Sequence, residues 1–177
     1  MGKVGKVVIL EGSPGADNAG QRKLGFDDAV KADGLETLDS RTAHWETEEA
    51  NSVFTNMLTA HPDIKGVMAA NDSMALGVVK ALDAAKRNDI KVVGFDNLPA
   101  IQPEIKAGKV LATVDQCGTQ MAAMGTDKAL AGVAGGAPLH GRAQTDLELS
   151  PADQPDTSHD AGCFHATPPH RISACTH

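Results

Sequence analysis

The chain has 177 residues, enough for one domain with a sizeable core, and its 41% hydrophobic and 22% charged residues are typical of globular proteins. A formal net charge of -7 argues against nucleic acid or an anionic membrane surface as a partner. No apolar run approaches the ~20 residues that span a bilayer, and the first residues show no signal-peptide pattern, so we expect no export signal.

Short β-branched segments alternate with helical patterns along residues 4–149, as in a parallel sheet covered by helices. Val4–Leu10 predicts the first strand, and Asn18–Ala32 predicts its helix. Leu35–Ser40 predicts the second strand. The helix after it, Glu46–Ala60, has the clearest pattern, because apolar residues recur at helical spacing and glutamates occupy its first turn.

Three further units follow in the chain. Gly66–Ala70 predicts the third strand, and a helix follows it. Lys91–Phe95 predicts the fourth strand, with a short helical stretch around Ile101–Ala107. Val110–Val114 predicts the fifth strand, before a long helix from Thr119 to Leu130. The fold class predicted is therefore α/β: a three-layer, doubly wound parallel sheet of about five strands with helices on both faces.

The last part of the chain has a different composition. Residues 151–177 hold four Pro, four His and two Cys without apolar periodicity, so we expect one lobe over residues 1–149 and a disordered tail over 150–177. A last strand is expected within Thr145–Leu149. The Cys and His spacing of the tail matches no standard zinc pattern, and we predict no metal site and no cofactor.

Candidate site residues follow the predicted strands where these strands end, and ligands of open parallel sheets bind beyond the carboxyl ends of the strands. They are, in chain order, Asn18, Trp45, Asn71, Asp96 and Gln116, and His44, Asp72, Asn97 and Asp115 share the same rim. A carboxylate accepts from adjacent hydroxyls, amides both donate and accept, and an indole face covers the C–H face of a sugar ring. The set therefore suits a neutral polyhydroxylated ligand.

The loop after the first strand does not suit a phosphate. Gly12–Gly20 matches neither G-x-G-x-x-G nor G-x-x-x-x-G-K-[ST], and Pro14 removes a backbone donor. Neither a G-x-S-x-G elbow nor an H-E-x-x-H pair supports a catalytic site. We therefore predict a binding module and no enzyme.

Several segments, in this order and spacing, resemble the sugar-binding proteins of the ribose, allose and galactose type: Ile9–Gly12, Leu58–Ile64, Ala70–Gly77, Val92–Asp96 and Ala112–Gln116. The resemblance covers the chain up to the tail. It implies the C-terminal lobe of a type I periplasmic binding fold, and a monosaccharide, pentose or hexose, as ligand. Such proteins deliver the sugar to the membrane component of an ABC transporter, some also present it to chemoreceptors, and they are periplasmic.

Residue roles carry over by position. Asn71 and Asp96 would hydrogen-bond sugar hydroxyls, Gln116 would add a bond near the hinge, and Trp45 falls where the family often places an aromatic. Many members have an arginine in the first turn, where the ungapped position here is Gly20. Asn18 or Arg22 can substitute for it.

Simpler roles stand beside these. Asn and Asp at strand ends commonly form turns and helix caps, and we expect Asp72 to be the cap of its helix. Trp45 can also be a core residue, and Arg22 a solvated helix residue. A lobe without its counterpart leaves the cleft half built, which predicts weak sugar binding and self-association through the exposed cleft or hinge face.

Two other classes of protein share the pattern. The first is the effector-binding domain of a lactose-repressor-family regulator, which has the same fold and similar Asn-Asp and Gly-Phe-Asp motifs. An upstream helix-turn-helix would mark it, and the run Ala112–Gln116 favours the transport proteins. The second is a structural or interaction remnant of the fold that binds no sugar.

Overall fold

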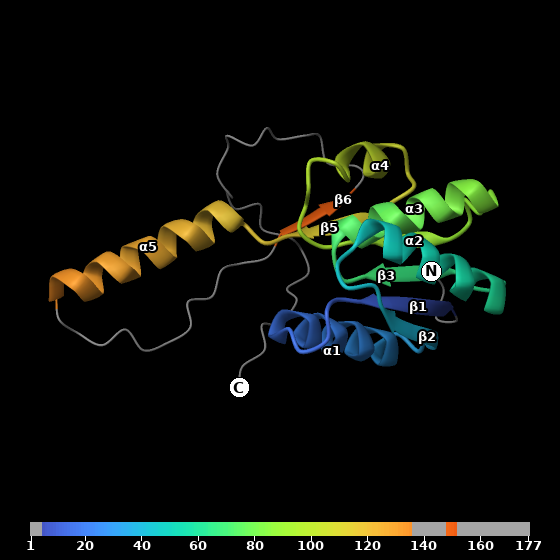
Figure 1. The fold of residues 1–177 in the computed structure, drawn as a ribbon, viewed down its shortest axis with the longest axis horizontal. Coiled ribbons are helices and arrows are strands. Elements are labelled where there is room, and N and C mark those ends of the chain that lie inside the picture. The colour runs from blue at the N-terminus through green and yellow to red at the C-terminus, as the bar shows by residue number, and fades with distance from the viewer. Residues whose placement is uncertain (1–4, 136–147, 152–177) are drawn as a thin grey trace.

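The computed structural model describes residues 5–135 and 148–151 (Figure 1). Its strands are β1 (Lys6–Glu11), β2 (Glu36–Thr42), β3 (Gly66–Ala69), β4 (Lys91–Val93), β5 (Ala112–Asp115) and β6 (Glu148–Pro151). Its helices are α1 (Asp17–Ala32), α2 (Thr47–Ala60), α3 (Asp72–Ala85), α4 (Gln102–Lys106) and α5 (Gly118–Gly135). All five predicted strand–helix units are confirmed. The expected disordered tail, with its Cys and His residues, lies outside the described residues except for Ser150 and Pro151.

The strands form one sheet in the order β2-β1-β3-β4-β5-β6. The first five strands pair in parallel, as predicted, and β6 pairs antiparallel with β5, with Ala112 opposite Pro151. The strand expected within Thr145–Leu149 thus lies slightly later and runs against its neighbour. β1 has β2 on one side and β3 on the other, so the strand order reverses between β1 and β3. Ligand crevices of open sheets open at such a point.

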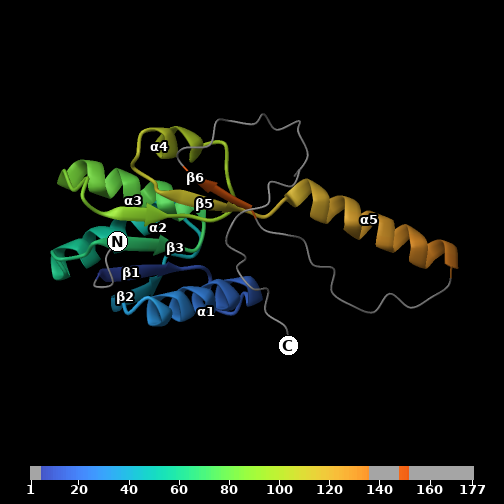
Figure 2. The ribbon, with the colours of Figure 1, turned by 180° about the vertical axis from the view of Figure 1, so that it is seen from behind.

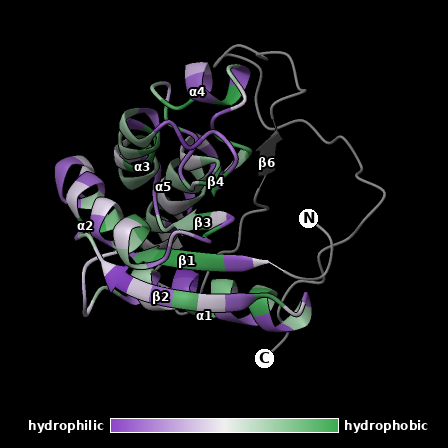
Figure 3. Ribbon diagram, turned by 90° about the vertical axis from the view of Figure 1, so that its right-hand side faces the viewer, coloured by the Kyte–Doolittle hydropathy of each residue, from purple (hydrophilic) through white to green (hydrophobic). Residues whose placement is uncertain are grey.

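One face of the sheet is buried beneath α2 and α3, which pack against each other. Val8 and Leu10 of β1, Val67 of β3 and Val92 of β4 belong to this core and are at most 1% exposed, as is Phe54 of α2. Figure 3 shows β1 as a hydrophobic strand, whereas the edge strand β2 carries polar residues. Each such side chain contributes about 1.5–3 kcal/mol by burial. This core fixes the strands whose carboxyl ends form the site described below.

The opposite face is covered at β1 and β2 by α1, which buries Ala19 and Val30. α5 begins just after β5 and projects away from the rest of the domain (Figures 1 and 2). Within the described ranges, no helix combines the length and apolar character needed to cross a lipid bilayer.

Candidate functional site

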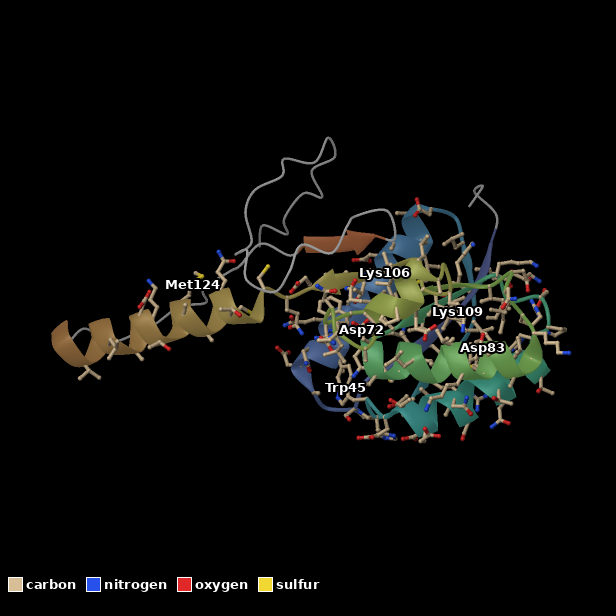
Figure 4. All side chains as sticks on the ribbon, turned by 90° about the horizontal axis from the view of Figure 1, so that it is seen from above. Trp45, Asp72, Asp83, Lys106, Lys109 and Met124 are labelled. Atoms are coloured by element: carbon tan, nitrogen blue, oxygen red, sulfur yellow. The ribbon has the colours of Figure 1, made fainter. Side chains whose placement is uncertain are left out.

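All six predicted site residues line one cavity of about 560 Å³ beyond the carboxyl ends of the strands. They are Asn18 and Arg22 on α1, Trp45 before α2, Asn71 before α3, Asp96 after β4 and Gln116 after β5. Figure 4 shows that the labelled Trp45 lies nearer to α5 than Asp83 and Lys109 do. The sequence therefore predicted correctly which side chains come together, and their contact with a ligand stays a prediction.

Arg22 reaches from α1 to the loop after β4. Its Nη1 donates to the Ala70 carbonyl oxygen at 2.6 Å, and its Nη2 donates to Asp96 Oδ1 at 3.3 Å. Gln116 Nε2 donates to the same Asp96 oxygen. The ion pair is largely shielded, because the Arg22 side chain is 11% exposed and that of Asp96 is 22% exposed. A guanidinium, a carboxylate and an amide from three elements thus form one connected polar group.

Two aromatic rings flank the Arg22 guanidinium. Its Cζ lies 3.9 Å from the centroid of the Phe95 ring and 5.4 Å from that of the Trp45 ring. Both distances are within the ~6 Å over which a cation is attracted to a ring face. The rings therefore help to hold the planar guanidinium in one orientation.

Burial shifts the pKa values of both Arg22 and Asp96. Burial raises the pKa of the Asp96 carboxyl group, and the charge of Arg22 and the hydrogen bonds from Gln116 and Arg22 oppose that shift. Burial also lowers the pKa of the Arg22 guanidinium, against the attraction of Asp96, although an arginine stays protonated at physiological pH. Burial thus opposes both charges, which Arg22 and Asp96 stabilise in each other, and in this poorly solvated place hydrogen bonds from a ligand have more effect than in water.

Trp45 lies on the tight connection between β2 and α2. His44 and Trp45 have φ angles of 48° and 70°, a region that non-glycine residues rarely adopt. The Thr42 hydroxyl holds this connection, because it donates to the Gly12 carbonyl oxygen at 2.7 Å and accepts from the His44 N–H at 3.2 Å. A Cβ at position 12 would lie 2.1 Å from the Trp45 ring, so the ring can take this place only against a glycine.

Asn71 is the N-cap of α3. Its Oδ1 accepts from the Met74 N–H at 2.9 Å, and its Nδ2 donates to the Trp45 carbonyl oxygen at 3.4 Å. The prediction that Asp72 caps this helix was wrong. Asp72 is the first residue of α3 and its side chain is completely buried, so the preceding asparagine satisfies the helix N-terminus.

Asp72 joins the loop after β4 to β5. Its Oδ1 accepts from the Thr113 hydroxyl at 2.7 Å, and its Oδ2 accepts from the Leu98 N–H at 2.9 Å. Burial raises the pKa of the Asp72 carboxyl group, which these hydrogen bonds partly offset. Since the bonded loop carries Asp96, Asp72 positions a site residue without lining the cavity itself.

Three lining residues were not predicted: Leu98, Gly118 and Met121. Asp115, which was expected on the rim beside Gln116, also lines the cavity. Its Oδ2 accepts from Asn97 Nδ2 and its Oδ1 from the Cys117 N–H, both at 2.7 Å, so it orients the backbone around the cavity. Leu98 and Met121 are apolar and carry no signal that distinguishes them from core residues.

Strained backbone is concentrated around this cavity. In the described part of the chain, the non-glycine residues with positive φ are His44, Trp45, Lys86, Asp96, Asn97 and Cys117. All except Lys86, which ends α3, lie on the loops that form the cavity. Such conformations cost on the order of 1–3 kcal/mol each and persist where the surrounding structure enforces them, most often at functional sites.

The whole lobe matches a known family. Residues 1–137 match the family model described as the periplasmic binding protein domain. This match takes in 137 of the 177 residues. The chain belongs to this family. Its parallel sheet, and a cavity at the carboxyl ends of the strands, are as the resemblance in the sequence implied.

Several named proteins are similar to this chain over most of its length. A D-ribose/D-allose-binding protein of Pseudomonas aeruginosa is 46% identical over 152 residues, which cover 83% of this chain and 48% of that protein. A ribose import binding protein of Salmonella typhimurium is 41% identical over 128 residues, which cover 72% of this chain and 43% of that protein. An ABC transporter periplasmic solute binding protein from Actinobacillus succinogenes, solved with bound D-allose, is 37% identical with a TM-score of 0.81. The match covers 86% of this chain and 54% of that protein. The chain spans about half the length of these relatives.

The resemblance in the sequence implied an arginine in the first turn, for which Asn18 or Arg22 was expected to substitute. Asn18 and Arg22 are four residues apart and share one face of α1, and both line the cavity. Gly20, at the ungapped position of the arginine that the resemblance implied, is exposed. The structure therefore brings Arg22 into the cavity from a position that the ungapped comparison does not indicate.

Proposed function

We propose that this lobe binds a neutral monosaccharide, a pentose or a hexose, as part of the solute-binding component of an ABC sugar import system, and that it catalyses no reaction. The observation that carries the proposal is the convergence of Arg22, Asp96, Gln116, Asn71 and Trp45 on one cavity. The relatives that cover most of this chain are named as binding proteins for ribose and allose, which supports the same class of ligand.

The polar groups keep free positions for ligand hydroxyls. Asp96 Oδ1 accepts from Arg22 and Gln116, and among the described residues no donor bonds Oδ2. That oxygen can accept from a sugar hydroxyl, and the Oε1 of Gln116 can accept from another. Asn71 Nδ2 makes only a long bond of 3.4 Å, to Trp45, and can donate to the ligand. The Trp45 ring supplies an apolar surface for the C–H face of a sugar.

The affinity of this lobe alone is expected to be low. Asn18 and Gly118, on the rim of the cavity, are exposed, so a bound sugar would keep much of its surface in water. Tight small-molecule sites bury most of their ligand. We therefore expect a dissociation constant in the millimolar range, and a value below about 10 μM, roughly 7 kcal/mol of binding, would contradict this part of the proposal.

The proposed partners follow from the same assignment. They are the membrane component of an ABC transporter and, in systems that couple transport to chemotaxis, a chemoreceptor, and the proposed location is the periplasm. A further part of the proposal is self-association of this lobe through its exposed cleft or hinge face. Light scattering with and without saturating sugar tests that part, because a ligand in the cleft must compete with association there. Association of which no part is weakened by sugar would contradict it.

Trp45 gives a direct readout, because it is the single Trp and the chain has no Tyr. We expect a saturable change in its emission when one of a panel of pentoses and hexoses is added at millimolar concentration. Asp96→Asn should weaken binding by about tenfold or more, because it removes a charged acceptor. Trp45→Phe serves as the blank for the fluorescence signal.

Asp83→Asn is the matched control for Asp96→Asn. Asp83 also forms an ion pair, with Lys109 at 2.7 Å, but it lies far from the cavity. Sugar binding should be unchanged in this variant. No saturable response to any sugar, or an equal loss in both aspartate variants, would contradict the proposed site.

A further inference from the structure

Helix α5 is almost completely exposed. All described side chains from Gly118 to Leu130 are exposed, except Met124, which is half-buried, and no other element of the described chain packs extensively against α5. Leu130 is 62% exposed and Val133 is 86% exposed. Only Asp127 and Lys128 are charged among its 18 residues. A helix so poor in charge is normally covered by other protein.

The face of the sheet on the α1 side is also incompletely covered. The pairing register places Met68 of β3, Val93 of β4 and Ala112 of β5 on the same face as Ile9 of β1. Ile9 is fully buried, because α1 covers β1 and β2. Met68, Val93 and Ala112 are only half-buried, as is Val114. Parallel sheets are normally buried on both faces, so β3–β5 lack a covering helix there.

We propose that α5 of one copy of this chain covers the β3–β5 face of a second copy, and that the second copy returns the same contact. The two surfaces are complementary in kind, because each is apolar and neither has a partner within the described residues of one copy. A contact in which each copy gives a helix and receives one is closed by a two-fold axis and does not propagate into fibres.

The start of α5 explains why the helix does not cover its own sheet. The Cys117 N–H donates to Asp115 Oδ1 at 2.7 Å, and Asn97 Nδ2 donates to Asp115 Oδ2 at 2.7 Å. The Met121 N–H donates to the Cys117 carbonyl oxygen at 3.0 Å, so the first turn of the helix is bonded to this fixed point. Only Gln116 and Cys117 separate β5 from α5. Folding back would break these bonds, and a short rigid connection of this kind favours exchange between copies.

The dimensions of the two surfaces set the expected strength. An 18-residue helix is about 27 Å long, and a four-residue strand is about 13 Å long. The last turns of α5, with Leu130 and Val133, would therefore lie on the sheet of the partner, and its first turns would bridge the two copies. With a helix diameter of about 10 Å, each contact is then about 13 Å long and about 10 Å wide. The interface is small for a specific one, so we expect a weak dimer, with a dissociation constant on the order of 100 μM.

Sedimentation of the full chain without sugar, from about 5 to about 500 μM, tests this inference. We expect a reversible monomer–dimer equilibrium that Leu130→Glu weakens by about tenfold or more, because the contact would bury an unpaired charge. Leu24→Glu is the matched control: Leu24 is 64% exposed on α1, close to the 62% of Leu130, but it lies on neither proposed surface. This variant should keep the dimer. Since Leu130 is exposed, its substitution leaves the fold of the monomer intact, which circular dichroism verifies.

A second variant tests the receiving surface. Val93→Lys should also give monomers, with its fold again verified by circular dichroism, and mixing it with Leu130→Glu should restore part of the association, because one of the two contacts is then intact. A strict monomer at all concentrations would overturn the inference, as would equal effects of Leu130→Glu and Leu24→Glu. The readout is independent of the sugar titration, so either idea can fail without the other.

Discussion

Aspartates at the two ends of the sheet behave in opposite ways. At the carboxyl ends of the strands, burial raises the pKa of Asp72 and of Asp96. Before β3 and β4, at the amino ends, Asp63 pairs with Lys6 at 2.6 Å and Asp89 pairs with Arg87 at 2.7 Å, and the pKa of each of these exposed carboxylates is lowered by its partner. The same residue type thus forms ordinary surface ion pairs at one end and desolvated polar groups at the other. The polar groups at the carboxyl ends are therefore held in place at a cost in stability, which is typical of functional sites.

The largest effect is expected at Gly94. A Cβ there would lie 2.1 Å from Asp72 Oδ1, so Gly94→Ala should displace the buried carboxylate and cost about 3 kcal/mol of unfolding free energy. Gly25→Ala is the control, because nothing lies within 4 Å of its Cβ position in α1. Alanine favours a helix, so this control should be neutral or stabilising. Urea unfolding measures both free energies. Equal changes in the two variants would show that Asp72 is not tightly constrained by position 94.

Asp72→Asn should cost less, about 1–3 kcal/mol, because an amide keeps one acceptor where the carboxylate has two. The pH dependence of this loss of unfolding free energy is a second test of the buried Asp72 carboxyl group. The pKa of Asp72 is raised in the folded protein above the ordinary value of 3.8, so the folded state holds this proton more tightly than the unfolded state. The contribution of Asp72 to stability should therefore fall as pH rises through 3.8 and through the raised pKa, and stay constant above it.

Urea unfolding of both proteins over that pH range measures this contribution as the difference between wild type and Asp72→Asn. A difference that grows with rising pH would show that hydrogen bonding outweighs the burial of the carboxyl group.

The sequence was sufficient for the fold and for most of the site. Alternating strand and helix patterns predicted the five parallel strands, and the strand-end rule predicted that Asn71, Asp96 and Gln116 lie together. It did not separate the roles of Asn71 and Asp72, since either side chain can cap a helix and only burial decides between them. The exposure of α5 was also beyond the sequence, because an apolar helix after the last parallel strand usually packs on its own sheet.

Gly12→Ala should have a moderate effect on stability, about 1–3 kcal/mol, and a clear effect on Trp45. The new methyl group would occupy the place of the indole ring, which must then move into solvent. We expect a red shift of the Trp45 emission and weaker sugar binding. Gly20→Ala, with nothing within 4 Å of its Cβ position, is the control and should leave the emission unchanged.

The smallest effect is expected at the amino ends of the strands. Asp89 is exposed and its ion pairs with Arg87 and Lys65 are screened by water, so Asp89→Asn should leave the thermal midpoint of unfolding at neutral pH nearly unchanged. Because the pKa of Asp89 is lowered in the folded protein, any stabilisation by its carboxylate is complete above the unfolded pKa of 3.8 and is lost as pH falls toward the lowered pKa. Thermal unfolding in high salt is the control, because salt screens these ion pairs. A large decrease in the thermal midpoint of Asp89→Asn at neutral pH would show that the amino ends of the strands also depend on their charges.

Amide chemical-shift mapping with a titrated sugar shows whether the carboxyl-end side chains form one ligand site, because it detects millimolar binding. We expect saturable shifts for the Trp45 indole N–H and for the side-chain amides of Asn71 and Gln116, with none around Asp63 and Asp89. Shifts spread over both ends of the sheet, or none at saturating ribose or allose, would show that these side chains do not form one ligand site.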